Sequence, residues 1–221
     1  YTIFWIVPIL LSVGISFTDW TGMKKLSEAN FVGLKNYGSL FSDSILCITI
    51  KNNLVYGVIL LALVPIISFF LAYIIETFLR RKTFWRTIAY LPAILPVIVT
   101  VLLWKWMYNP QYGLLNKLME LIGLGKYTTG WLTNSSTALY AVTFTSLWKT
   151  IPTYFVLFMA GLQSVPKELT EAAILDGAGR WDLIRYVTIP SIKRIITIVY
   201  VLVFIDVFRV FDLVYAMTNG G

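Results

Sequence analysis

The chain has 221 residues, of which 58% are hydrophobic and 13% are charged, and its formal net charge is +7. A mean hydropathy of +0.76 lies far above that of an ordinary soluble domain and indicates an integral membrane protein. The chain contains no histidine, which excludes histidine-based metal sites and serine–histidine triads. It has one cysteine, Cys47, which excludes an internal disulfide. The basic residues lie at the ends of apolar runs, where anionic lipid and topology control explain them better than nucleic acid does.

Five apolar runs predict five membrane-spanning helices. A helix rises 1.5 Å per residue, so about 20 residues cross the ~30 Å hydrocarbon layer. Since lipid offers the backbone no hydrogen-bond partners, such runs are expected to be helical, and the fold class is all-α integral membrane. Buried helices of a soluble bundle are the less favoured alternative, because the second run carries no charge and shows no polar face. The expected spans are about residues 1–18, 52–75, 87–108, 138–162 and 195–217.

Basic residues predict the orientation of these spans. The connection between the second and third spans contains Arg80, Arg81, Lys82 and Arg86. The loop between the fourth and fifth spans, residues 163–194, contains Lys167, Arg180, Arg185, Lys193 and Arg194. Because cytoplasmic loops carry an excess of lysine and arginine, both loops and the N-terminus are expected in the cytoplasm.

Both ends of the chain predict further protein beyond them. Tyr1 opens directly on an apolar run that has no basic segment before it, so we read this run as a span and not as a signal peptide. The last residues, Asn219 to Gly221, are typical of the start of a turn. A sixth span is therefore expected after the end of the chain.

Prolines inside four of the runs predict kinked helices, because each removes an intrahelical hydrogen bond. They are Pro8, Pro65, Pro92, Pro96 and Pro152. Two interpretations stay open. The kinks are static and are relieved by neighbouring helices, or the kinked spans surround a pathway that opens and closes.

The polar segment EAAILDGAGRWDLIRYVTIP, from Glu171 to Pro190, lies between two spans. We expect a helix over 167–178, ended by glycines, and a second helix over 181–189, with Pro190 marking the start of the fifth span. Ala172 and Ala173 keep one face of the first helix narrow, so that another surface can approach closely. Such an elbow is typical of a docking device for a soluble partner, and a generic amphipathic interfacial helix is the alternative.

The segment also resembles the EAA loop of binding-protein-dependent ABC importer permeases. Further stretches resemble the carbohydrate-importer subfamily of the maltose and glycerol-phosphate type: FVGLKNYGSLF (31–41), LPAILPVIV (91–99), LLWKWMYNPQYGLLN (102–116), AGLQSVPKEL (160–169) and FDLVYAMTNGG (211–221). The resemblance implies a type I ABC importer permease-like helical bundle, with five spans in this chain. Ile189 departs from the leucine usual in the family, which is a conservative change.

The resemblance further implies the partners of the chain. The loop would be the coupling helix that inserts into a cleft of a cytoplasmic ATPase subunit, through Glu171, Ala172, Ala173, Asp176, Gly177 and Pro190. The implied complex contains a second permease subunit, two ATPase subunits and an extracytoplasmic solute-binding protein, in a bacterial or archaeal inner membrane. ATP and Mg²⁺ would bind to the ATPase subunits, and this chain would bind no cofactor or metal. Its Gly125-Lys126 does not complete a phosphate-binding loop, because Tyr127 follows where serine or threonine is needed.

Charged residues within the fifth span are costly in lipid and are expected to face protein or water. Asp206, Arg209 and Asp212 are spaced three apart, which predicts one stripe on a helix. Asp206 and Lys149 both lie about eleven residues into their spans, or ~17 Å deep, so we expect them to meet near the midplane. A pair in the transport pathway and a purely structural ion pair are equally open.

Aromatic rings suit sugars, because the C–H face of a pyranose packs on a ring. Depth and the resemblance together give the candidate pathway residues Trp148, Lys149, Tyr154, Phe204, Asp206, Phe208 and Arg209. For each aromatic residue, packing or lipid contact is the alternative. The predicted function is a permease subunit of an ATP-driven importer that translocates a sugar or oligosaccharide. An ion-coupled secondary transporter that uses Asp206 and Lys149 is the alternative, and a membrane-bound enzyme ranks third.

Overall fold

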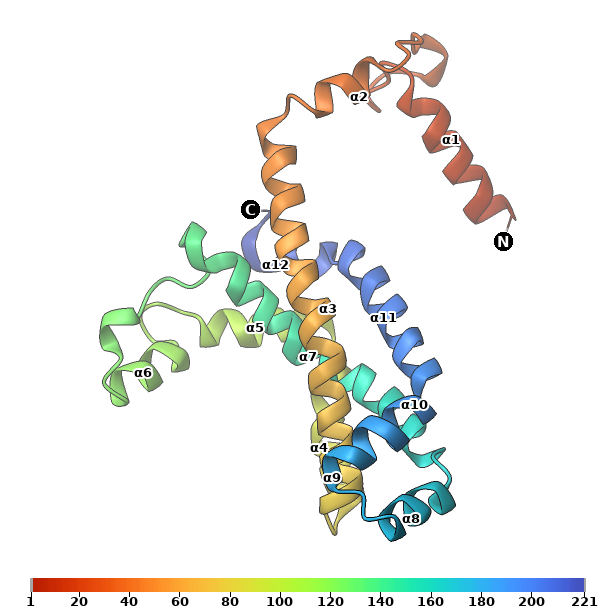
Figure 1. Ribbon diagram of the computed structural model, residues 1–221. Coiled ribbons are helices and arrows are strands. Elements are labelled where there is room, and N and C mark those ends of the chain that lie inside the picture. Colours follow the sequence, from red (N-terminus) through yellow and green to blue (C-terminus); the bar gives the residue numbers. More distant parts are fainter. Residues whose placement is uncertain (1, 221) are drawn as a thin grey trace. The chain divides into compact units, whose positions relative to one another are not determined.

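A computed structural model describes residues 2–220, and these residues form helices joined by turns and loops (Figure 1). Within that range, the one β interaction is an isolated bridge between Thr18 and Phe31. The expectation of an all-α fold is therefore confirmed. The chain divides into two compact units between Asn52 and Asn53, and each unit is described by itself.

The first unit contains short helices joined by polar turns. Its elements are a π-helix (Thr2–Ile6), α1 (Val7–Ser16), a 3-10 turn (Leu26–Glu28), α2 (Lys35–Leu40) and the beginning of α3 (Ser44–Phe78). The Asn36 amide donates to the carbonyls of Ser16 and Thr18, at 2.9 and 2.8 Å, and so ties α2 to the end of α1. The Asp19 carboxylate accepts hydrogen bonds from the backbone and side chain of Asn30, which lower the pKa of Asp19.

The second unit contains the remaining helices. They are the rest of α3, then α4 (Lys82–Ile94), α5 (Val97–Met107), α6 (Leu114–Leu121), a 3-10 turn (Gly125–Tyr127), α7 (Ser135–Gln163), α8 (Lys167–Leu175), α9 (Arg180–Asp182), a π-helix (Leu183–Thr188), α10 (Ile189–Ser191), α11 (Lys193–Phe208) and α12 (Phe211–Thr218). α3 has 35 residues and a mean hydropathy of 2.9 over 18 of them, which suffices to cross a membrane. By length and composition the described residues contain one such helix, or two if the bent pair α4 and α5 forms one span. The five-span arrangement thus stays a prediction.

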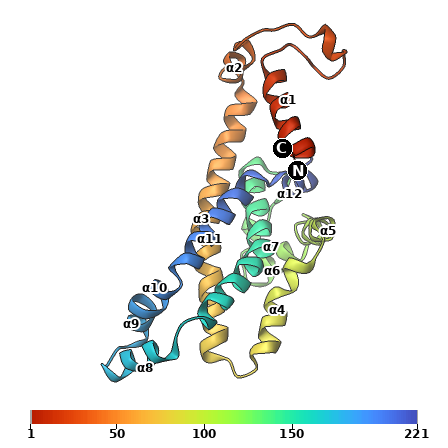
Figure 2. The same cartoon turned by 90° about the vertical axis from the view of Figure 1, so that its right-hand side faces the viewer.

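The expected third span, 87–108, is not one helix. α4 and α5 are bent by 94° where they meet at Leu95 and Pro96. In Figure 2, α4 lies in the plane of the picture while α5 is seen end-on. Proline has no N–H to continue the ladder and favours an extended residue before it, and Leu95 has a ψ of 131°. The predicted kink is confirmed at Pro96, whereas the helices run on through Pro65, Pro92 and Pro152.

The expected fifth span, 195–217, is also broken. α11 ends at Phe208 and α12 begins at Phe211, so Arg209 and Val210 lie outside both helices. The predicted single stripe of Asp206, Arg209 and Asp212 is therefore wrong. Neither proline nor glycine stands at this break, and the helices instead follow two different hydrophobic cores.

The two cores divide the second unit. The first is built mainly from α3, α7 and α11, and its fully buried side chains include Leu60, Val64, Phe155, Phe158, Val199 and Val203. The second joins α5, α7 and α12, through Val101, Trp104, Tyr108, Ala141, Val142, Leu213 and Met217. α11 packs in the first core and α12 in the second, and Val210 between them touches both. The break at Arg209 thus marks the change from one core to the other.

Glycine allows close packing between α3 and α11. A Cβ atom at Gly57 would lie 2.8 Å from Cγ1 of Val207, which is buried. Small residues at such crossings let helix backbones approach each other in membrane proteins.

We predict that Gly57→Ala destabilises the protein by about 1–3 kcal/mol, because the added methyl overpacks a β-branched neighbour that has little rotamer freedom. Thermal unfolding of the purified protein in detergent measures the change. Val207→Ala in the same chain should recover most of the loss. Gly14→Ala is the control, because no atom lies within 4 Å of a Cβ there. Equal stability of Gly57→Ala and the parent would contradict the packing argument.

Candidate functional site

The polar segment forms the predicted elbow, which begins with α8 and a tight glycine turn. α8 ends at Leu175, three residues before the predicted end at 178, and Asp176 caps it. Gly177 has a φ of +84°, and its N–H donates to the carbonyl of Ile174. The N–H of Ala178 donates to the carbonyl of Ala173 at 2.9 Å. These two bonds form a Schellman motif, in which glycine supplies the left-handed residue that a side chain would strain.

A second helical run, residues 180–191, follows the turn. The Asp182 carboxylate accepts the N–H of Gly179 at 3.0 Å, and this contact fixes the start of the run. The run passes through α9, a π-helical stretch and α10, so it begins one residue earlier than predicted and continues past Pro190. Pro190 therefore does not mark the start of the fifth span, because α11 begins only at Lys193. Its exposed side chain lies near the end of the elbow.

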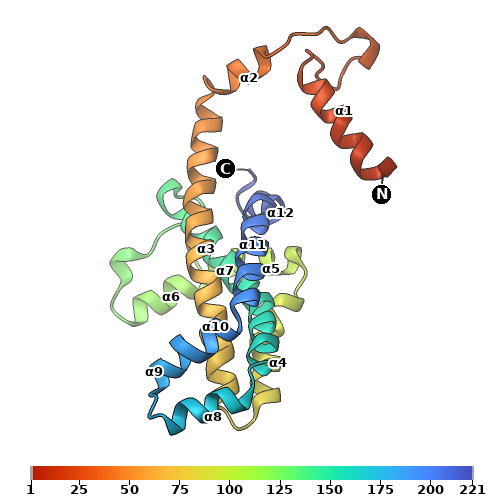
Figure 3. The same ribbon diagram turned by 45° about the vertical axis from the view of Figure 1, so that its right-hand side comes forward.

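α8 is largely exposed and lies at one end of the second unit, beside the α3–α4 connection (Figure 3). Glu171, Ala172 and Asp176 are exposed, and Ala173 is half-buried against the rest of the elbow. Large apolar side chains on α8 are exposed too, with Leu175 at 88%. The others are Leu169 and Ile174. A short helix that shows both a carboxylate and unpartnered apolar side chains is typical of an interaction surface.

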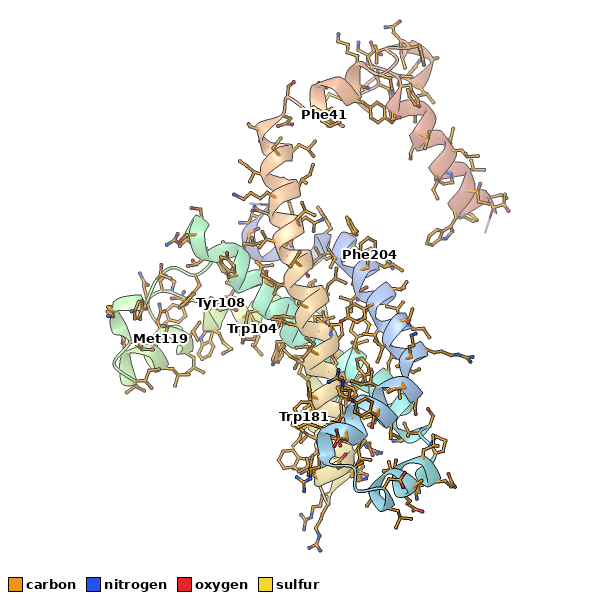
Figure 4. The ribbon with its side chains drawn as sticks, viewed as in Figure 1. Phe41, Trp104, Tyr108, Met119, Trp181 and Phe204 are labelled. Carbon is orange, nitrogen blue, oxygen red and sulfur yellow. The ribbon has the colours of Figure 1, made fainter. Side chains whose placement is uncertain are left out.

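The second half of the elbow is fastened to α3. The Trp181 ring packs edge-on against Phe70, with 6.3 Å between the centroids, and Figure 4 shows Trp181 beside α3. The Arg180 guanidinium lies 5.1 Å from the centroid of the Phe78 ring. Ile184 is buried in the first core. These contacts join the second half of the elbow to α3.

Glu76, which was not among the residues predicted from the sequence, joins the ends of three helices close to the elbow. It lies near the end of α3 and bonds to residues of α4 and α7. It forms an ion pair with Arg86 of α4, and its second oxygen lies 3.5 Å from Nζ of Lys82. Gln163, the last residue of α7, donates to Glu76 at 3.4 Å. These are the ion pairs within residues 2–220. The signal for Glu76 was its place as the one carboxylate before a dense run of basic residues.

Lys149 and Asp206 do not meet in this structure, contrary to the prediction. Nζ of Lys149 donates to the backbone carbonyl of Leu95 at 2.5 Å. Asp206 instead accepts the hydroxyl of the buried Tyr154, at 2.6 Å between that oxygen and Oδ2. The break between α4 and α5 leaves the Leu95 carbonyl outside any helical ladder, and the lysine satisfies it.

The aromatic pathway candidates lie on two sets of helices. Trp148 is half-buried in the second core and packs edge-on against Trp104, at 5.5 Å between centroids. Phe204 and Phe208 are exposed on α11, as is Arg209 after it, and the two rings are 5.0 Å apart. Figure 4 shows Phe204 on α11, whereas Trp104 and Tyr108 lie at the contact of α5 with α7. Trp104, whose ring also contacts Tyr108 and Phe144, was not among the residues predicted from the sequence.

Two buried polar groups of α5 have no hydrogen-bond partner within the part of the chain that the structure describes. They are the hydroxyl of Thr100 and the indole N–H of Trp104. Buried polar groups are normally satisfied, so this region has unused capacity for hydrogen bonds. Within the same residues, no cluster of three or more acidic or cysteine side chains could hold a metal ion.

Comparison with known proteins agrees with this architecture. Residues 68–221 match the family described as the binding-protein-dependent transport system inner membrane component. The chain is 36% identical to "Probable ABC transporter permease protein YurN" of Bacillus subtilis, over 100% of this chain and 76% of that protein. It is 30% identical to the trehalose/maltose transport system permease protein MalF of Thermococcus litoralis, over 98% of this chain and 74% of that protein.

The fold is also that of a solved transporter chain. The crystal structure of a bacterial ABC transporter involved in the import of the acidic polysaccharide alginate contains a similar chain. The two agree with a TM-score of 0.80 and 22% sequence identity, over 99% of this chain and 76% of that one. The family match covers well over half of the chain and includes the whole elbow. The chain belongs to the binding-protein-dependent transport system inner membrane components, and it is a permease component of an ABC importer, without catalytic activity of its own.

Proposed function

We propose that the chain translocates a carbohydrate and that separate cytoplasmic ATPase subunits drive it by docking on α8. The exposed elbow carries this proposal. It shows Leu175 almost fully to solvent, and its shape is fixed by the turn at Gly177. An apolar side chain at 88% exposure on a nine-residue helix has no role in the packing of this chain, and a groove on a partner would bury it.

The docking contact would combine apolar and charged groups. Leu169, Ile174 and Leu175 would fill the partner groove, and Ala172 would let the two backbones approach. The exposed Glu171 would pair with a basic side chain of the ATPase subunit. Asp176 and Gly177 would set the depth of insertion, because they end the helix.

The elbow would couple ATP use to opening of the pathway. ATP and Mg²⁺ would bind to the ATPase subunits, whose closure would displace α8. The contacts of Trp181 with Phe70 and of Gln163 with Glu76 would pass that displacement to α3 and α7. The bundle would then change between inward-facing and outward-facing states, which both ATP and solute bias.

The solute would pass between polar and aromatic groups of α7 and α11. The exposed Asp206 carboxylate, whose Oδ2 accepts the Tyr154 hydroxyl, offers a further acceptor for a sugar hydroxyl. Trp148, Phe204, Phe208 and Arg209 would line the same route. The trehalose/maltose permease relative and the sequence stretches typical of sugar importers support a carbohydrate. The family's dependence on a binding protein also argues against an ion-coupled secondary transporter, and Lys149 and Asp206 form no ion pair within residues 2–220.

The arrangement in the membrane is part of the proposal. The five apolar runs would cross a bacterial or archaeal inner membrane, with the N-terminus and the elbow in the cytoplasm. A second permease subunit would complete the pathway, and an extracytoplasmic binding protein would deliver the solute. The basic residues around Arg81 and Arg180 support this orientation.

Uptake into proteoliposomes tests the proposed function. The complex purified with this chain is reconstituted with its binding protein outside and ATP inside, and labelled trehalose or maltose is offered. We expect uptake that requires both hydrolysable ATP and the binding protein. Uptake that persists with a non-hydrolysable analogue, or that excludes every sugar offered while another class of solute enters, would contradict the proposal.

A further inference from the structure

The break between α4 and α5 lies at the border between the two cores. Ala89 of α4 packs against the first core, whereas Val97, Val101 and Trp104 of α5 belong to the second. α4 packs along α7, and α5 packs against α12. The 94° bend is what lets one stretch of chain serve both cores.

Such a bend leaves backbone groups without helical partners. The last carbonyls of a helix have no intrahelical donors, and Pro96 contributes no N–H. Within a bilayer, an unsatisfied carbonyl is costly, since lipid supplies no donor. Nζ of Lys149 fills this role by donating to the carbonyl of Leu95 at 2.5 Å.

Among the described residues, Lys149 has no competing partner. The ion pairs within residues 2–220 all involve Glu76, and Asp206 is engaged by Tyr154. The half-buried ammonium of Lys149 therefore interacts with the backbone of the break and with no carboxylate. This arrangement explains why a lysine can lie in an apolar helix without an acidic partner.

We propose that Lys149 is a positioning residue that holds the α4–α5 break at its angle. α7 carries Lys149 in its middle and ends at Gln163, which bonds to Glu76, and Glu76 pairs with Arg86 of α4. α4 is thus connected to α7 at two places. Near its start, Arg86 reaches Gln163 through Glu76, and at its end the Leu95 carbonyl accepts Lys149. A displacement of the elbow would move α4 together with α7, and the break would let α5 keep its place in the second core.

The angle of the break can be measured by the distance between spin labels at Thr83→Cys and Trp106→Cys, two exposed positions near the far ends of α4 and α5. The exposed Cys47 is replaced by serine in this background. Two helices bent by 94° at Leu95 place these positions about 23 Å apart, whereas one straight helix would place them about 35 Å apart. The full chain is used, in the complex with which it purifies and in lipid nanodiscs.

We expect Lys149→Met to shift the distance distribution by several Å toward the longer value and to broaden it. Lys149→Arg, which keeps a donor, should stay close to the parent, and Lys105→Met on α5 should leave the distribution unchanged. Lys149→Gln, whose side chain is one atom shorter than that of lysine, should shift the distance distribution as Lys149→Met does. It replaces Lys149→Met in the experiment if the methionine variant does not assemble. A Lys149→Met or Lys149→Gln distribution identical to that of the parent would overturn the inference.

A transport assay then separates this inference from the proposed function. The uptake measurement rests on the proposed function, because it requires that the complex imports a sugar. We expect the assembled Lys149→Met complex to lose at least about tenfold in the uptake rate, with Lys149→Arg largely retained. The distance measurement needs no transport. Failure of the parent complex to import a sugar would therefore count against the proposed function alone, and an unchanged distance would count against Lys149 alone.

Discussion

Gly177→Val should uncouple the ATPase subunits from this permease, with ATP-driven uptake reduced by about 5- to 30-fold. A non-glycine residue in the left-handed region costs roughly 1–2 kcal/mol, and this free energy corresponds to a factor of about 5 to 30 in an equilibrium constant. A Cβ at Gly177 meets no atom within 4 Å, so the loss would come from the backbone and not from a clash. The valine would favour another turn geometry and move α8 away from its docking position.

Two measurements separate uncoupling from unfolding in this variant. Gly177→Asn is the matched control, because asparagine tolerates the left-handed region and should retain most of the uptake. The thermal unfolding of the valine variant should stay near that of the parent, since neither core includes the turn. Full uptake by Gly177→Val would show that the Schellman turn does not set the position of α8.

Asp206→Asn should abolish most uptake while the complex still assembles, if the Tyr154–Asp206 pair lies in the pathway. The asparagine can still accept the Tyr154 hydroxyl, which lies 2.6 Å from Oδ2, but it lacks the charge that a sugar hydroxyl would meet. We expect a loss of at least about tenfold in the uptake rate, or about 1.4 kcal/mol. Uptake and co-purification of the partner subunits are measured on the same preparation.

The purely structural interpretation of this pair predicts a different pattern. Tyr154→Phe would then cost about 1.5–3 kcal/mol of stability, the range for a hydrogen bond to a charged group, and Asp206→Asn would leave uptake intact. Asp212→Asn is the control, since this exposed carboxylate has no hydrogen bond or ion pair within residues 2–220. Unimpaired uptake by Asp206→Asn would remove Asp206 from the pathway.

Local sequence signals predicted most of the elbow. Signals at helix ends act through the backbone of a few neighbouring residues, so the turn at Gly177 and the start of α8 at residue 167 could be foreseen. The sharp break at Pro96 follows from the same kind of reasoning. The end of α8 was predicted three residues too far, because the capping residue Asp176 was taken for a helical one.

The rest depends on tertiary contacts that no local pattern contains. The break at Arg209 has no proline or glycine and exists because α11 and α12 pack in different cores. The pairing of Lys149 with Asp206 was predicted from depth alone. In the structure, Lys149 instead donates to the backbone carbonyl of Leu95, which the break between α4 and α5 leaves outside a helix. Glu76 was overlooked because its importance lies in joining the ends of α3, α4 and α7, which are far apart in the sequence.

Cross-linking from α8 to an ATPase subunit tests the coupling role of the elbow most directly. Leu175→Cys, in a chain whose Cys47 is serine, places a thiol at the most exposed of the large apolar positions of α8. We predict a cross-link from this thiol to the ATPase subunit of the purified complex, and a change in its yield when ATP is bound. A thiol at Leu121, which is 82% exposed on α6, should give no such product. Absence of a cross-link from Leu175→Cys in a complex that still takes up solute would contradict the account.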